Sequence, residues 1–80
     1  MLQVTIVSPQ AIVFQGEAQR VIVPGEQGIF EVGPFHRPLI SLLLPGRIVV
    51  DDHVFDIQRG VIKVVADTIT ALIEPSTSGE

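Results

Sequence analysis

The chain has 80 residues, of which 46% are hydrophobic, and it carries no cysteine and a formal net charge of −4. This length fits a single domain, and the apolar content argues against disorder. Nine acidic residues against five basic ones, without Trp or Tyr, exclude the basic and aromatic surface that nucleic-acid binding requires. The longest apolar run is too short to span a bilayer, so we expect no direct insertion into lipid.

The composition favours β-strands, because Val and Ile number 22 against 6 Leu and 4 Ala. Turn signals recur at short intervals. They are Ser8-Pro9, Gln15-Gly16, Pro24-Gly25, Gly33-Pro34, Pro45-Gly46, Asp51-Asp52, Arg59-Gly60 and Ala66-Asp67. This spacing predicts an all-β fold, a flattened sandwich of two mixed or antiparallel sheets with about ten short strands.

The segments between these turns differ in their apolar pattern. Residues 2–7 alternate, with Leu2, Val4 and Ile6 on one face, and residues 54–57 alternate more weakly. Three segments are nearly continuous apolar runs, which suit strands buried on both faces or strands whose outer face meets a partner. These runs are Val21–Val23, Leu42–Leu44 and Val61–Val65. No window shows helical periodicity.

The chain end differs from the rest in composition. Residues 75–80 are polar and begin with a proline, so we expect a disordered tail after a sandwich domain at residues 1–74.

Candidate chemical sites are few. Asp51, Asp52 and His53 could donate metal ligands, but three adjacent residues on a hairpin cannot close a site alone. We interpret them as a solvated turn. Pro24–Gly28 is Gly-rich but lacks the lysine and following helix of a phosphate-binding loop. We therefore predict no catalytic, metal or cofactor site.

Lys63 is the only lysine in the chain. Lipoyl and biotinyl carrier domains are small all-β modules that display one lysine on a hairpin tip, so a carrier domain is an alternative function. Ile62 and Val64 continue a strand through Lys63, which favours an outward-facing strand lysine instead. A generic β-sandwich adaptor is a further alternative.

Several short motifs follow one another from Val4 to Glu74. They are IVSP (6–9), FQGE (14–17), VPG (23–25), GIF (28–30), VGPFHRPLI (32–40), LPG (44–46), GVIKV (60–64) and TALIE (70–74). In this order they resemble the N-terminal β-sandwich domain of the ε subunit of F-type ATP synthase, called δ in mitochondria. Residues 32–40 are the strongest match, being like the family's P-G-H-A-P-L-L.

The resemblance implies a non-catalytic rotor subunit in the central stalk of F1Fo ATP synthase. In this family the sandwich binds the γ subunit along one side and rests on the polar loops of the membrane c-ring. It couples proton-driven rotation to ATP synthesis and meets the α/β heads only indirectly. The resemblance thus places the protein at the cytoplasmic face of a bacterial inner membrane, bound peripherally through the ring.

The resemblance also implies which residues contact the c-ring loop and γ. These are Ile29, Phe30, Glu31, Phe35, His36, Arg37, Leu39 and Ser41. Ile29 stands where some members carry an acidic residue, and Glu31, on the same strand face, is expected to supply that carboxylate.

Two of these residues are larger than is usual in the family. Phe35 stands where the family usually has Gly or Asn, and Arg37 where it often has Ala. We expect Phe35 to pack against the ring and Arg37 to pair with one of its polar loops. Pro34 and Pro38 would limit the ordering cost.

Most members of the family continue into a C-terminal helical hairpin that can inhibit ATP hydrolysis and in some members binds ATP. This sequence ends at Glu80. Either the subunit naturally lacks the hairpin or the sequence is a truncated piece. In the first case we expect no hairpin-based inhibition and no nucleotide site.

Overall fold

Residues 1–76 are described by the structure, a computed structural model. Their regular structure consists of eight β-strands. The strands are β1 (Leu2–Val7), β2 (Ile12–Ala18), β3 (Val21–Gly25), β4 (Gly28–Val32), β5 (Leu39–Leu43), β6 (Gly46–Val50), β7 (His53–Val65) and β8 (Thr68–Pro75).

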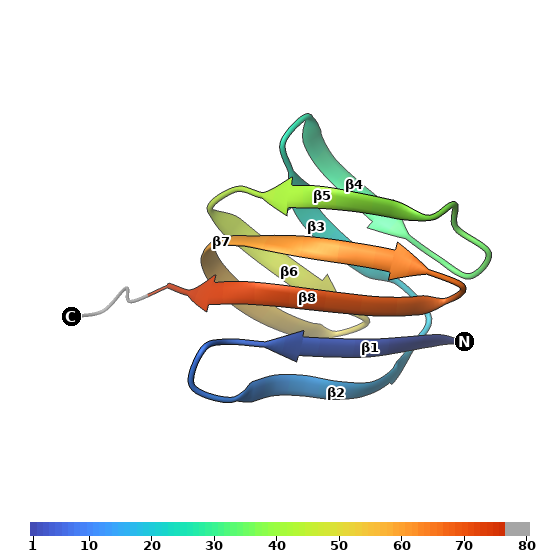
Figure 1. The fold of residues 1–80 in the computed structure, drawn as a ribbon, viewed down its shortest axis with the longest axis horizontal. Helices are drawn as coiled ribbons and strands as arrows, with labels where there is room; N and C mark the ends of the chain where they lie inside the picture. Colours follow the sequence, from blue (N-terminus) through green and yellow to red (C-terminus); the bar gives the residue numbers. More distant parts are fainter. Residues whose placement is uncertain (77–80) are drawn as a thin grey trace.

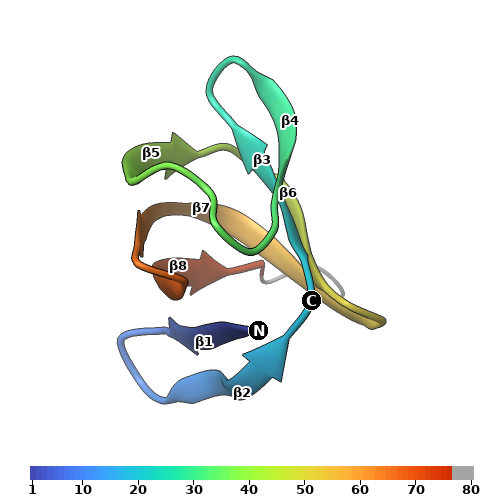
Figure 2. The same ribbon diagram turned by 90° about the vertical axis from the view of Figure 1, so that its right-hand side faces the viewer.

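The strands form two layers, which face each other in Figure 2. One layer has the strand order β2-β1-β8-β7-β5, and the other contains β4, β3 and β6 (Figure 1). Strand β1 runs parallel to β8, whereas the other neighbouring strands pair antiparallel. The predicted all-β sandwich with mixed pairing is therefore confirmed, with eight strands in place of about ten.

Strand β7 joins the two layers. Its first part, 53–57, pairs with β6, and its second part, 60–64, pairs with both β5 and β8. The register with β8 shifts between Ile57 and Arg59, where the strand passes from one layer to the other. Gly25 of β3 also pairs with Leu43 of β5. The two layers therefore form one hydrogen-bonded network rather than two separate sheets.

Two of the predicted turns are wrong and explain the lower strand number. Gln15-Gly16 lies inside β2, and Arg59-Gly60 lies inside β7. A Cβ atom at Gly60 would lie 2.7 Å from the carbonyl oxygen of Leu72, so this glycine permits a close approach of two strands rather than a turn. The connection between β2 and β3, at residues 19–20, was not predicted.

The core lies between the two layers and is built from alternate residues of the strands. In β1, the side chains of Leu2, Val4 and Ile6 are buried, which confirms the alternation predicted for residues 2–7. The buried apolar residues are Leu2, Val4, Ile6, Ala18, Val21, Val23, Val32, Leu43, Ile48, Val50, Ile57, Ile62, Val64, Ile69, Ala71 and Ile73.

The predicted tail begins inside the last strand. Pro75 is the final residue of β8, and the backbone N–H of Ser76 donates to the carbonyl oxygen of Asp56 at 3.2 Å. The other residues of that tail, 77–80, lie outside the described residues. Within residues 1–76, no helix has the length and apolar character needed to cross a membrane.

Candidate functional site

The loop between β4 and β5, residues 33–38, lies at one end of the sandwich. The β7–β8 turn and the start of β1 lie at the same end, on the right of Figure 1. Phe35 is 94% exposed, Arg37 is exposed and His36 is half-buried. His36 Nδ1 donates to the carbonyl oxygen of Arg37 at 2.8 Å. The loop therefore presents an aromatic ring and a guanidinium to the solvent.

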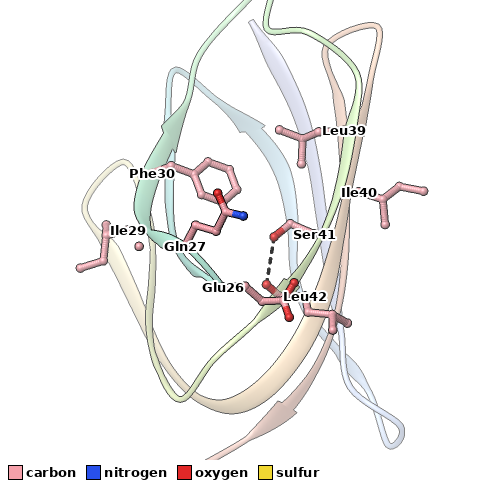
Figure 3. A pocket seen from close by; sticks show the side chains of 9 residues that line it. Glu26, Gln27, Ile29, Phe30, Leu39, Ile40, Ser41 and Leu42 are labelled. Atoms are coloured by element: carbon pink, nitrogen blue, oxygen red, sulfur yellow. Dashed lines mark hydrogen bonds between the residues drawn. The ribbon is translucent and has the colours of Figure 1, made fainter.

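Four other predicted site residues gather at a groove of about 560 Å³ between β4 and β5 (Figure 3). Phe30, Leu39 and Ser41 point into this groove, whereas Ile29 points away from it. Phe30 and Leu39 are half-buried and pack against the core, and Ser41 Oγ donates to the carbonyl oxygen of Leu42 at 2.9 Å. Their contact with a partner stays a prediction.

Strand β4 carries the remaining predicted residue, Glu31. Ile29 and Glu31 are exposed, whereas Phe30 is half-buried and Val32 is buried. Ile29 lies opposite Pro24 of β3, and Glu31 lies on the same face two positions along. The structure therefore places Ile29 and Glu31 on one outward face, as the sequence predicted.

A row of apolar side chains crosses the outer face of the five-stranded layer. Leu42 lies opposite Val61, Val61 opposite Leu72, Val7 beside Leu72, and Ile12 opposite Val7. Residues directly opposite each other in a sheet share one face. We call these five residues the outer row. Ile12, Leu42 and Leu72 are 62%, 55% and 50% exposed, so the row has substantial contact with solvent.

The outer row lies away from the 33–38 loop. Leu42, Val61 and Leu72 line a shallow hollow of about 440 Å³. The neighbouring row towards the loop is mostly polar, since it contains Lys63, Thr70 and Thr5. Sequence analysis missed this row as a unit. The sequence signal for it was the pair of apolar runs Leu42–Leu44 and Val61–Val65. Such runs indicate either a strand buried on both faces or a strand whose outer face meets a partner.

Lys63 lies in the middle of β7, opposite Ile40 of β5 and Thr70 of β8. Its side chain is exposed, as predicted for an outward-facing strand lysine. It is separated from the β7–β8 turn by Val64 and Val65. Lys63 is therefore not at the hairpin tip that a carrier domain uses.

The β6–β7 turn, which contains Asp51, is hydrogen-bonded to the β2–β3 connection. The Asp51 Oδ1 atom accepts hydrogen bonds from the backbone N–H groups of Gln19 and Arg20, each at 3.1 Å. The ring of His53 lies against that of Phe14, with centroids 5.3 Å apart. Among residues 1–76, no group of three or more His, Asp or Glu side chains is placed to hold a metal ion.

Two ion pairs lie on the exposed surface. Arg47 Nε lies 3.2 Å from Asp56 Oδ1, and Arg59 Nε donates to Glu74 Oε1. The hydrogen bond and the charge of Glu74 raise the pKa of the Arg59 guanidinium. Exposed pairs of this kind contribute little to stability because water and salt screen them.

The sandwich thus carries an apolar row on one layer and an exposed aromatic loop at the end remote from that row. Contiguous exposed apolar side chains mark surfaces for macromolecular partners. This arrangement defines a β-sandwich domain with a contiguous exposed apolar surface.

Residues 1–77 match the family described as the beta-sandwich domain of the ATP synthase Delta/Epsilon chain. The chain belongs to this family.

Curated relatives agree with this assignment. The chain is 38% identical over 78 residues to an ATP synthase epsilon chain of Nitratiruptor sp., covering 91% of this chain and 60% of the relative. It is 39% identical over 77 residues to an ATP synthase epsilon chain of Maricaulis maris, covering 91% of this chain and 58% of the relative. The chain therefore spans about three fifths of the length of these relatives.

A solved structure has the same fold. A chain in the cryo-EM structure of the central stalk and c-ring of the Tetrahymena thermophila mitochondrial ATP synthase matches with a TM-score of 0.77. The match covers 99% of this chain and 73% of that chain, at 16% sequence identity. At this identity the likeness concerns the fold.

Proposed function

We propose that the protein is a non-catalytic rotor subunit in the central stalk of a bacterial F1Fo ATP synthase. It binds the γ subunit and rests on the c-ring, and it couples proton-driven rotation to ATP synthesis. It reaches the α/β heads only indirectly. Its place is the cytoplasmic face of the inner membrane, where the ring holds it peripherally. Membership of the Delta/Epsilon family supports this proposal.

The outer row is the observation that carries the proposal. Its five apolar side chains come from five adjacent strands, β5, β7, β8, β1 and β2. A partner that covers them gains the free energy of burying apolar surface. The row lies on strands that are paired on both sides in β1, β7 and β8, so it is a firm platform. We assign the outer row to γ.

The 33–38 loop is the contact with the c-ring in this proposal. Phe35 and Arg37 are exposed, and their loop lies at the end of the sandwich where β4 leads into β5, away from the outer row (Figure 1). Aromatic and arginine side chains are enriched in interface cores. Because the two surfaces are apart, the subunit can bind γ and the ring together.

Co-purification tests the γ contact. The tagged subunit is expressed in cells whose synthase lacks its own copy, and we expect the wild type to bring γ and the c-ring with it. Leu72→Asp puts a charge in the outer row and should abolish recovery of γ. Thr70→Asp is the matched control, since Thr70 is exposed on the same face of β8, and it should retain γ.

The outcomes separate the alternatives. A wild type that brings no γ points to a generic adaptor instead. Recovery of γ with Leu72→Asp at the level of Thr70→Asp would show that the outer row is not the γ contact. The intact mass of the purified subunit addresses the carrier alternative, because a modified Lys63 would support it.

The ring contact is tested by alanine at Glu31, His36 and Arg37 together. All three lie outside the buried core, so we expect the fold and γ binding to persist while attachment to the ring weakens. A triple variant that assembles and couples normally would show that the ring binds elsewhere.

A further inference from the structure

Phe35 combines two features that are energetically unfavourable for a phenylalanine, a left-handed backbone and an exposed ring. Its φ is 64°, in the left-handed region where bulky residues are rare, and its side chain is 94% exposed. The other non-glycine residues with positive φ in residues 1–76 are Asp51, Ala66 and Asp67, and all three lie in two-residue hairpin turns. Such backbone conformations persist only where the surroundings enforce them.

Asp67 is the residue that restrains Phe35. The backbone N–H of Phe35 donates to Asp67 Oδ1 at 2.8 Å. Asp67 is itself fixed, because its turn is closed by the pairing of Val65 with Thr68. Its carbonyl oxygen also accepts a hydrogen bond from the N–H of Gln3 at 2.9 Å. The Phe35 backbone is therefore tied to β1, β7 and β8 through one carboxylate.

We infer that Asp67 is a positioning residue, which fixes the backbone at Phe35 so that its ring projects into solvent as an anchor for the partner of the 33–38 loop. This inference rests on the proposed function, which places the c-ring against that loop. A loop whose backbone is already fixed loses less conformational entropy on binding. Pro34 and Pro38 restrict the loop in the same sense, since each fixes its own φ.

The anchor fits a particular partner chemistry. The Phe35 ring requires an apolar pocket on the partner. Arg37 is exposed two residues away, and its guanidinium requires hydrogen-bond acceptors next to that pocket. The ring surface that meets the loop should therefore offer a small apolar pocket next to carboxylate or carbonyl oxygens.

Three variants of the complete subunit separate the role of Asp67 from general stability. Asp67→Gly permits the positive φ of the turn but removes the acceptor. Asp67→Asn keeps an acceptor oxygen and tolerates the left-handed conformation. Asp51→Gly is the matched control, since Asp51 also has positive φ and accepts backbone N–H groups from a distant connection.

Two measurements are made on each variant. Amide hydrogen exchange at Phe35 reports the hydrogen bond, and binding to synthase depleted of the subunit reports the anchor. We expect Asp67→Gly to speed exchange at Phe35 and weaken binding, each by about tenfold, the scale of a hydrogen bond to a charged group. Asp67→Asn should stay close to the wild type. Asp51→Gly should lose protection at Gln19 and Arg20 but bind normally.

The results distinguish the two levels of inference. If Asp67→Gly binds as tightly as Asp51→Gly, or if exchange at Phe35 is unchanged, Asp67 is not a positioning residue even though the proposed function stands. If the wild type itself fails to bind the depleted synthase, the proposed function is wrong and the role of Asp67 falls with it.

Discussion

Replacing Gly60 by alanine should destabilise the domain, because β8 crosses very close to β7 at this point. The added Cβ would lie 2.7 Å from the carbonyl oxygen of Leu72 and 3.0 Å from Cγ2 of Ile73. The Leu72 oxygen belongs to the backbone of a central strand, so it cannot move without disturbing the ladder. Overpacking of this kind costs about 2–3 kcal/mol.

A smaller effect opposes this cost. Alanine restricts the unfolded chain more than glycine does, which stabilises the folded state by about 0.5–1 kcal/mol. The net loss is then about 1–2.5 kcal/mol, a sizeable share of the about 4–12 kcal/mol expected for a domain of this length. At about 4–8 °C per kcal/mol, the melting temperature of Gly60→Ala should fall by about 10 °C.

Gly16→Ala is the matched control for this measurement. Gly16 also lies inside a strand, but its Cβ would meet only the ring of Phe14, at 3.8 Å. This variant should be neutral or gain up to about 1 kcal/mol. Thermal unfolding followed by circular dichroism compares the two. If Gly60→Ala melts at or above the temperature of the wild type, the close approach of β8 is not what requires glycine.

Two further predictions concern stability. Ile62 is 1% exposed in the core, so Ile62→Ala should lower the free energy of unfolding in urea by about 2–5 kcal/mol, and a loss below about 1 kcal/mol would contradict this packing. Arg59→Gln should leave the urea midpoint at pH 7 unchanged, because the ion pair with Glu74 is exposed. Glu74 raises the pKa of Arg59 in the folded state. The small contribution of this ion pair to stability is therefore fully present at pH values below the unfolded-state pKa of Arg59. The contribution is lost only as pH rises through the folded-state pKa, so titration of Arg59 should cause no change in stability between pH 6 and 9.

Local sequence signals predicted the fold class but not every strand boundary. Turns at Asp51-Asp52 and Ala66-Asp67 were predicted correctly, because aspartate tolerates the left-handed backbone conformation that Asp51 and Asp67 adopt. Arg59-Gly60 was misread, since glycine serves both turns and close strand contacts. The neighbour that distinguishes these cases, Leu72, is distant in sequence and unknown until the pairing of β7 with β8 is known.

The candidate site was predicted only in part for the same reason. The exposed loop with Phe35 and Arg37 follows from a contiguous motif. The roles of Asp51 and Asp67 depend on hydrogen bonds to residues 31–32 positions away, which no local pattern reveals. The outer row likewise requires the register of five strands, although the apolar runs Leu42–Leu44 and Val61–Val65 gave a hint.

The parallel pairing of β1 with β8 has a consequence for synthesis of the protein. Strand β1 leaves the ribosome first, but one of its two edges has no partner until Thr68–Leu72 has also emerged. At about 5–20 residues per second this interval lasts about 3–14 s. During it, the β1–β2 hairpin exposes Leu2, Val4 and Ile6, which the finished domain buries. The nascent chain should therefore be a substrate for ribosome-associated chaperones until its last strand is made.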